Sequence, residues 1–140
     1  MLTFEKYHQE LVIPSDINEL NNVEFFLDKL QSDLNLPDSL YANIVITVTE
    51  AVNNAIIHGN QLDINKTVHL TAKLNNPYSL SIFVKDQGKG FDISKVKDPT
   101  LMENIFSENG RGVFVMKHLS DDLIYHDNGT LIELKFNLNL

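Results

Sequence analysis

The alternation of apolar and polar positions predicts helices in the first half of the chain and strands mainly in the second. Residues 3 to 13 are rich in aromatic and β-branched side chains and end at Pro14, which predicts an opening strand. A helical period follows over residues 16 to 34, and Asp16 with Glu19 has the spacing of a capping box at its start. The apolar stripe of this helix comprises Leu20, Val23, Leu27, Leu30 and Leu34.

A second amphipathic helix is predicted from about Asp38 to His58, and Gly59 is a natural residue to end it. Its core side comprises Tyr41, Ile44, Val45, Val48, Val52 and Ala55. Residues 61 to 66 are polar, which predicts a surface connection to the strands that follow.

The polar face of this second helix is the first candidate site. Glu50 and Asn54 are four residues apart, so they share one face, with Asn53 beside them. Ile46 and Ile57 fall on that face too, and a carboxylate and two amides among isoleucines suggest the lining of a cavity. A polar edge on a half-exposed helix is the alternative, because this spacing is common by chance.

Period-two alternation predicts antiparallel strands in the second half of the chain. One strand covers residues 68 to 74 and the next covers residues 80 to 85. A C-terminal hairpin joins residues 123 to 126 and 130 to 136 through Asp127-Asn128-Gly129, in which Asn-Gly is a strong turn signal.

Asp86 is the second candidate site. It has the parity of the buried positions before it, so its carboxylate is predicted to face the covered side of the sheet, where an acid is costly unless donors meet it. Gly88 and Gly90 follow, and glycine lets the backbone approach a ligand closely. Thr130 shares parity with the buried positions of the last strand, which predicts a hydroxyl near Asp86. The alternative is an ordinary glycine turn with a capping aspartate.

A long segment without clear period, residues 91 to 109, fits a binding loop or lid. Asn109-Gly110-Arg111-Gly112 ends it, and a short helix is predicted after it over residues 113 to 119. Glycine-rich backbone before a helix N-terminus favours anions, and Arg111 adds a positive charge suited to phosphate. A surface arginine in a turn is the alternative.

The composition fits one globular domain over residues 1 to 140. The chain is 43% hydrophobic, which suffices for a core, and its net charge of −8 argues against a general nucleic-acid binder. The absence of cysteine excludes disulfides and thiolate metal sites, and the five histidines show no metal-ligand spacing. We find no signal pattern, no basic membrane-binding segment and no apolar run that approaches a membrane span, so we expect a cytoplasmic protein.

Four motifs, taken in order, resemble those of the gyrase and histidine-kinase type ATPase superfamily, the Bergerat fold. They are Glu50-x-x-x-Asn54 on a helix, Asp86-x-Gly88-x-Gly90 after a strand, Gly110-x-Gly112 before a helix and Gly129-Thr130 opening a strand. The resemblance covers nearly the whole chain. The segments TEAVNNAIIHGN and VKDQGKGFD are similar to segments of the stand-alone anti-sigma factor serine kinases of bacterial partner-switching systems. It implies an α/β two-layer sandwich, with a mixed, mostly antiparallel sheet of about five strands and three helices on one face.

The resemblance also implies that the chain binds ATP and Mg²⁺. Asp86 would receive the adenine amino group with support from Thr130, and Asn54 would bind Mg²⁺ through its side-chain oxygen. Glu50 would be the general base that activates a serine or threonine hydroxyl of a partner protein. Residues 91 to 109 would close over ATP. The remaining nucleotide contacts would come from Gly88, Gly90, Gly110, Arg111 and Gly112.

Three functions stay open at this stage. The first is an anti-sigma regulatory factor that phosphorylates an anti-sigma-antagonist protein and sequesters a sigma factor. The second is a non-catalytic, nucleotide-gated partner-switching module, and the third is a histidine-kinase-like domain acting on a separate histidine-bearing protein. Glu50 favours the first over the second, and the short lid and the absent dimerisation helix count against the third. The lid sequence DPTLMENIFSENGRG departs from the lid sequence of the best-known sporulation and stress-response members of this kinase family. The sigma factor, the antagonist, the signal and homodimer formation are not revealed by the sequence.

Overall fold

A five-stranded sheet forms one layer of the protein, and helices form the other. The computed structural model describes residues 7–91 and 108–138, except for the side chains of residues 108–110. The strand order is β1-β2-β3-β5-β4, and all four pairings are antiparallel. The strands are β1 (His8–Pro14), β2 (Thr67–Asn76), β3 (Ser79–Lys85), β4 (Asp122–His126) and β5 (Leu131–Asn137).

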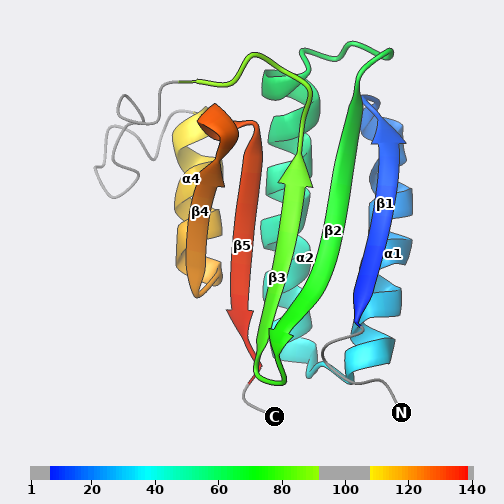
Figure 1. The fold of residues 1–140 in the computed structure, drawn as a ribbon, viewed down its shortest axis with the longest axis vertical. Helices are drawn as coiled ribbons and strands as arrows, with labels where there is room; N and C mark the ends of the chain where they lie inside the picture. The colour runs from blue at the N-terminus through cyan, green and yellow to red at the C-terminus, as the bar shows by residue number, and fades with distance from the viewer. Residues whose placement is uncertain (1–6, 92–107, 139–140) are drawn as a thin grey trace.

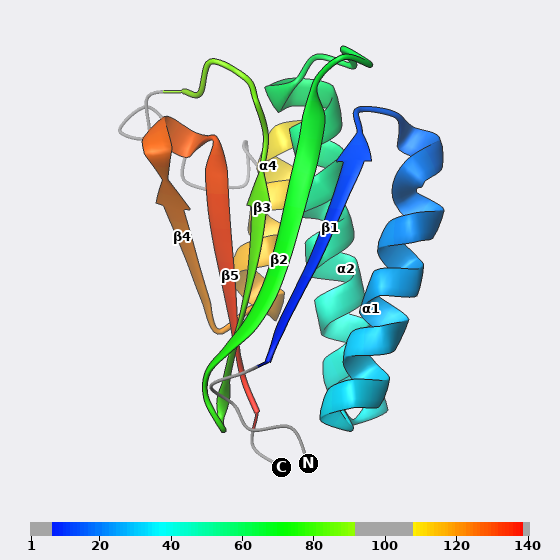
Figure 2. The same cartoon turned by 45° about the vertical axis from the view of Figure 1, so that its right-hand side comes forward.

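Three helices of the described chain cover the same face of this sheet, as Figure 1 and Figure 2 show. They are α1 (Leu20–Leu34), α2 (Asp38–Asn54) and α4 (Glu108–Leu119). The core between the layers is built from the predicted inward positions of the strands, for example Leu70, Ile82 and Leu134, which are fully buried. The predicted two-layer α/β fold is therefore confirmed, and the described sheet is entirely antiparallel where a mixed sheet was predicted.

The first helix begins with half of the predicted capping box. The Oδ1 of Asp16 accepts the N–H of Asn18 at 2.9 Å and caps a 3₁₀ turn, Ile17–Glu19, that leads into α1. The N–H of Asp16 donates to the carbonyl of Pro14 at 2.9 Å, so this donor does not depend on the Glu19 side chain. The segment predicted as helix from residue 16 is consequently α-helical from Leu20 onward.

The α2 helix continues at its C-terminal end into a π-helical turn, Ala55–Gly59. Such turns are rare and occur frequently at functional sites. The combined helix, Asp38–Gly59, contains a window with a mean hydropathy of 1.3, so by length and composition it could span a membrane. The expectation that no apolar segment approaches a membrane span was therefore wrong. In this fold its apolar side instead packs against the sheet, with Ile44, Val48 and Val52 fully buried.

The α4 helix begins earlier than predicted. It starts at Glu108, so Gly110, Arg111 and Gly112 lie inside its first turns and not in a loop before it. Glycine disfavours helix interiors by about 1 kcal/mol, but tertiary packing outweighs this preference at Gly112. A Cβ added at Gly112 would lie 3.0 Å from Oε2 of Glu50, so a residue without a side chain lets α4 pack closely on α2.

A buried polar network ties the strands together on the sheet face away from the helices. Glu133 is 8% exposed, accepts from the hydroxyl of Ser81 at 2.9 Å and contacts Nε2 of His126 at 2.9 Å. Burial alone would raise the pKa of Glu133, but hydrogen bonds from His126 and Ser81, together with the charge of Lys135, outweigh burial and lower it. The network joins β3, β4 and β5 next to the turn at residues 127–129.

Candidate functional site

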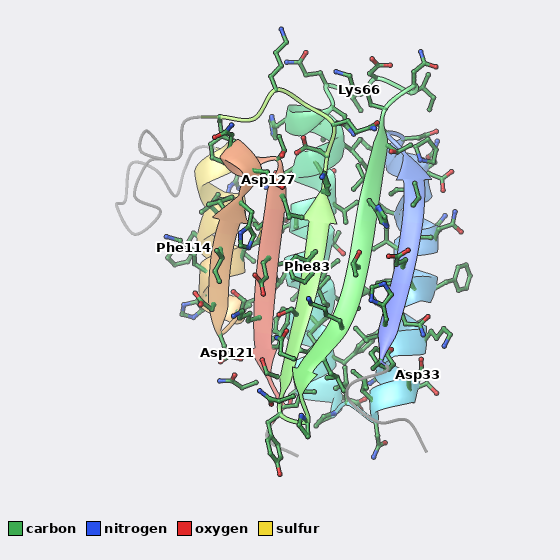
Figure 3. The ribbon with its side chains drawn as sticks, in the orientation of Figure 1. Asp33, Lys66, Phe83, Phe114, Asp121 and Asp127 are labelled. Carbon is green, nitrogen blue, oxygen red and sulfur yellow. The ribbon has the colours of Figure 1, made fainter. Side chains whose placement is uncertain are left out.

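A cavity of about 690 Å³ opens between the end of α2, the end of β3, α4 and the β4–β5 turn. Its size is that of a small-molecule site. Figure 3 shows Lys66 and Asp127 at this same end of the sheet, one on each side of β3. The apolar lining comprises Ala51, Ala55, Val84, Phe91, Val113, Met116, Tyr125 and Ile132, and the polar lining comprises Asn54, His58, Gln61, Lys66, Asp86, Lys89 and Thr130.

The structure brings five of the predicted site residues to this cavity. They are Asn54, Asp86, Gly88, Gly90 and Thr130. Within the described residues, Glu50, Arg111 and Gly112 do not line it, and Arg111 is exposed to solvent. The predicted lid, residues 91 to 109, lies outside the described residues except at its two ends.

Asp86 projects from the end of β3 into the cavity, as its parity predicted. Its N–H donates to the carbonyl of Thr130 at 2.9 Å, and its Oδ1 accepts the N–H of Gly88 at 2.8 Å. Burial raises the pKa of the Asp86 carboxyl, and the Gly88 N–H and the charge of Lys66 partly offset this rise. A half-buried carboxylate in an apolar-walled cavity is a directional acceptor suited to a neutral N–H donor.

Gly59 is the last residue of the helix that begins at Asp38, as predicted, and its lack of a side chain also provides space beside Asp86. It carries no left-handed φ, and the positive φ values come afterwards, at Gln61 and Leu62. A Cβ added at Gly59 would lie 2.3 Å from Oδ2 of Asp86. The predicted end of the helix at Gly59 is confirmed, and the absence of a Cβ there also lets the carboxylate approach the helix backbone. A Cβ at Gly88 would in turn lie 2.1 Å from the carbonyl oxygen of Gly59.

Gly59→Ala should therefore weaken binding of a ligand that contacts Asp86, by roughly 10-fold or about 1.4 kcal/mol, because the carboxylate must move away from the new methyl group. Calorimetric titration of the variant with ATP measures this loss. The matched control is the double variant with Asp86→Asn. If Gly59→Ala acts through the carboxylate, the two losses will not add, whereas additive losses would show that Gly59 acts independently of Asp86.

The segment after Asp86 is docked on the β4–β5 turn. Gly90 has a φ of +77°, and the N–H of Phe91 donates to the carbonyl of Asn128 at 2.7 Å. The ring of Phe91 packs edge-to-face on Tyr125, with centroids 5.3 Å apart, and covers Gly129, whose φ is +84°. Left-handed backbone is easily adopted by glycine, so the positions of Gly90 and Gly129 have a conformational reason as well as a steric one.

Thr130 lies at the cavity, but not in the conformation that its parity predicted. Its backbone is helical (φ −77°, ψ −15°), and β5 begins one residue later, at Leu131. The hydroxyl of Thr130 donates to the carbonyl of Asp127 at 2.8 Å and closes a 3₁₀ turn, Asp127–Gly129. Since the residue is not extended, strand alternation does not determine where its side chain points. Its oxygen can still accept a hydrogen bond.

Glu50 and Asn54 both face α4. A Cβ on Gly112 would lie 3.0 Å from Oε2 of Glu50 and 3.4 Å from Nδ2 of Asn54, so the two side chains lie together as their spacing predicted. Asn54 lines the cavity and Glu50 is half-buried one turn earlier. Ile46, which was predicted to help line a cavity, is 46% exposed, so that part of the prediction was wrong. The described residues contain no cluster of three acidic, histidine or cysteine side chains suited to a metal ion.

Sequence reasoning missed several residues that line the cavity. Lys66 was placed in a polar connection, yet it lies near enough to Asp86 to affect its pKa. Met116 and Tyr125 supply apolar wall from α4 and β4, two elements that precede and follow a turn at residues 120–121. No local pattern could identify these residues, because their proximity depends on how α4 packs over the sheet.

Comparisons with known proteins indicate the family and the fold of this chain. The family model described as a histidine kinase-like ATPase domain matches residues 13–136. An anti-sigma F factor of Heyndrickxia coagulans is 34% identical over 108 residues, covering 74% of this chain and 73% of that protein. An anti-sigma F factor of Clostridium perfringens is 35% identical over 102 residues, covering 69% of this chain and 72% of the relative.

A solved structure shares the fold. The crystal structure of the RsbU and RsbW domains of a Mycobacterium tuberculosis protein superimposes with a TM-score of 0.67 over 95% of this chain. The sequences are 18% identical, so this likeness concerns the fold alone. The match spans 32% of that longer chain.

Proposed function

The chain belongs to the histidine kinase-like ATPase domain family, and from this premise we propose that it is an ATP-binding anti-sigma regulatory factor in the cytoplasm. In this proposal it phosphorylates a serine or threonine of an anti-sigma-antagonist protein and sequesters a sigma factor. The names of the two relatives, both anti-sigma F factors, support the regulatory role. The single observation that carries the proposal is the half-buried carboxylate of Asp86 in the cavity that Asn54 also lines.

The cavity fits an adenine nucleotide. Its apolar walls suit a planar base, and Asp86 offers an acceptor that a purine amino group would satisfy. The hydroxyl of Thr130 supplies a second polar group at the same wall. Phosphates would extend toward α4, where Gly110 and Arg111 fall among the first four helical residues, whose N–H groups lack helical acceptors.

The residues present also fit a magnesium ion bound together with the nucleotide. Mg²⁺ commonly takes one or two protein oxygens and completes its shell with phosphate and water, so the single amide oxygen of Asn54 is a sufficient protein ligand. When bound, the ion would neutralise charge on the phosphates. The absence of an acidic cluster among the described residues is compatible with a site of this kind.

Glu50 is the residue that we propose as general base. It lies one turn before Asn54 on the face of α2 that meets α4, so it would border the phosphate end of the cavity. A carboxylate there would accept the proton of the partner's serine or threonine hydroxyl as its oxygen attacks the terminal phosphorus, while the bond to the bridging oxygen of ADP breaks. Positioning and charge neutralisation supply the rest of the rate.

A second function, the non-catalytic nucleotide-gated module, is favoured by one observation. Glu50 is packed on Gly112 and does not line the cavity in the described residues, which is also what a structural carboxylate would do. The histidine-kinase-like function is disfavoured, because both relatives are named anti-sigma F factors.

Phosphotransfer with radiolabelled ATP tests the proposal. The purified chain is incubated with the cognate antagonist, and retention of the cognate sigma factor is measured in parallel. We expect label on a serine or threonine of the antagonist and nucleotide-dependent retention of the sigma factor. Sigma retention without any label would favour the nucleotide-gated module, and failure to bind ATP would refute both functions.

Asn54→Ala should weaken binding of Mg·ATP by roughly 10-fold, about 1.4 kcal/mol, and leave metal-free ATP binding nearly unchanged. The substitution deletes a ligand oxygen for the metal and no contact to the base. Titrations with magnesium and with EDTA measure the two affinities. Equal losses in the two titrations would show that Asn54 acts on the nucleotide or on the fold, and not through the metal.

A further inference from the structure

Asn60 is a fully buried amide directly after the π-helical turn that ends α2. Its Nδ2 donates to Oγ of Ser15 at 2.8 Å and to the carbonyl of Thr67 at 2.9 Å. Its Oδ1 accepts the N–H of Gln87 at 2.7 Å. Both donor protons and the acceptor oxygen are thus used, and one side chain joins the ends of β1, α2 and β3 to the start of β2.

The two chain segments joined by Asn60 enclose Asp86. Gln87 follows Asp86 directly, so its bond to Asn60 holds the peptide next to the carboxylate. Gly59 precedes Asn60, and its backbone packs against Oδ2 of Asp86 so tightly that a Cβ would lie 2.3 Å away. Gly88 packs in turn on the carbonyl of Gly59. The Asn60–Gln87 bond therefore sets the separation between helix end and strand end at the place where Asp86 projects.

Backbone pairing between β2 and β3 does not determine this separation. The register of β2 with β3 ends at His69↔Lys85, and Thr67 lies beyond it. The carbonyl of Thr67 is bonded by Asn60, and its N–H donates to Oε1 of Gln87 at 2.7 Å. The side chains of Asn60 and Gln87 thus take the place of backbone hydrogen bonds to Thr67 just beyond the end of β3.

We propose that Asn60 is a positioning residue that orients Asp86 for recognition of the adenine amino group. This inference rests on the adenine role of Asp86 in the proposed function. Hydrogen bonds weaken steeply with misalignment, so a small displacement of the carboxylate removes base recognition. In that proposal the phosphates are bound at α4 and through a magnesium ion held by Asn54, so these contacts do not depend on Asn60.

The preference for ATP over inosine triphosphate isolates this effect, because inosine triphosphate lacks the amino group and keeps the phosphates. We expect the wild type to prefer ATP by roughly 10- to 100-fold, which corresponds to about 1–3 kcal/mol for an unpaired buried polar group. Asn60→Ala should reduce this preference to below about 3-fold through weaker ATP binding, with little change in affinity for inosine triphosphate, since that nucleotide has no amino group to donate to Asp86 in either protein. Calorimetry with both nucleotides measures the ratio.

Two variants separate positioning from general destabilisation. Ser15→Ala removes one partner of Asn60 and leaves its bond to Gln87, so it should lower the midpoint of thermal unfolding without changing the nucleotide preference. Asn60→Asp keeps an oxygen for the N–H of Gln87 and loses the donor to Thr67, so it should be less stable and still prefer ATP. If Asn60→Ala does not fold, this variant still tests the inference, because loss of its preference for ATP would contradict the role of the Asn60–Gln87 bond.

The outcomes distinguish this inference from the proposed function. A wild type with equal affinity for both nucleotides refutes the adenine role of Asp86, and the positioning role with it. A wild type that prefers ATP, together with an Asn60→Ala variant that keeps the same preference, refutes the positioning role alone. Loss of the preference in Asn60→Asp, or in Ser15→Ala, would likewise overturn it.

Discussion

Glu50→Gln should slow phosphorylation of the antagonist by about 10²–10⁴-fold, the usual contribution of a general base, while ATP binding and sigma-factor binding stay close to wild type. Glutamine keeps the size and much of the hydrogen bonding of glutamate, but it cannot accept the proton of the attacking hydroxyl. Its packing on Gly112 should also be retained, since the side chain is isosteric. Single-turnover phosphotransfer with radiolabelled ATP measures the rate.

Glu24→Gln is the matched control for this experiment. Glu24 is exposed on α1, so its substitution removes the same charge and should leave the phosphotransfer rate unchanged. Equal rates in wild type and Glu50→Gln would assign Glu50 a structural role beside α4. A chain that phosphorylates no cognate antagonist in its wild-type form would put the nucleotide-gated module in first place.

Asp86→Asn should weaken ATP binding by roughly 10- to 100-fold, about 1–3 kcal/mol, without loss of stability. The amide places a donor where the adenine amino group needs an acceptor, whereas an oxygen remains for the N–H of Gly88. Because burial raises the pKa of Asp86, the ionised carboxylate destabilises the folded state, and the neutral amide removes that penalty. Calorimetry and urea denaturation of both proteins measure the two effects.

The stability difference between Asp86→Asn and wild type should depend on pH in one direction. Below the unfolded-state value of about 3.8, Asp86 is protonated in both states and carries no penalty. As pH rises, the unfolded state ionises first, and wild type loses stability relative to the variant until the raised folded-state pKa is passed. A stability difference that shrinks with rising pH would show that the fold stabilises the ionised carboxylate. Unchanged ATP affinity in Asp86→Asn would refute the adenine role of Asp86.

Local patterns were sufficient for most of the secondary structure. Period-two alternation placed Leu70 and Ile82 on the buried face of adjacent strands, and helical periodicity placed Val48 and Val52 in the core. These predictions succeeded because the side-chain direction within one regular element follows from its geometry alone. The same reasoning placed Asp86 in the cavity, since the strand keeps its alternation up to that residue.

Where the backbone leaves regular geometry, local patterns were insufficient. Thr130 lies in a 3₁₀ turn and does not follow strand parity. The α4 helix extends through Gly110 and Gly112, although glycine usually marks the outside of a helix. At Gly112 a Cβ would lie only 3.0 Å from Oε2 of Glu50, so glycine eases the close packing of α4 on α2. The local conformations predicted for Gly110, Gly112 and Thr130 were therefore wrong.

The sequence by itself determined most of the helices and strands and the inward side of each regular element, since both depend on periodicity within single elements, and its resemblance to a known superfamily implied the fold class. The tertiary structure alone decided how these side chains meet. Gly59 and Asp86 are in contact because α2 and β3 end side by side, and Asn60 bonds Gln87 across 27 positions of the chain. Such contacts depend on how helices and strands pack against one another. No single stretch of sequence contains this information, because the residues that pack together lie far apart along the chain.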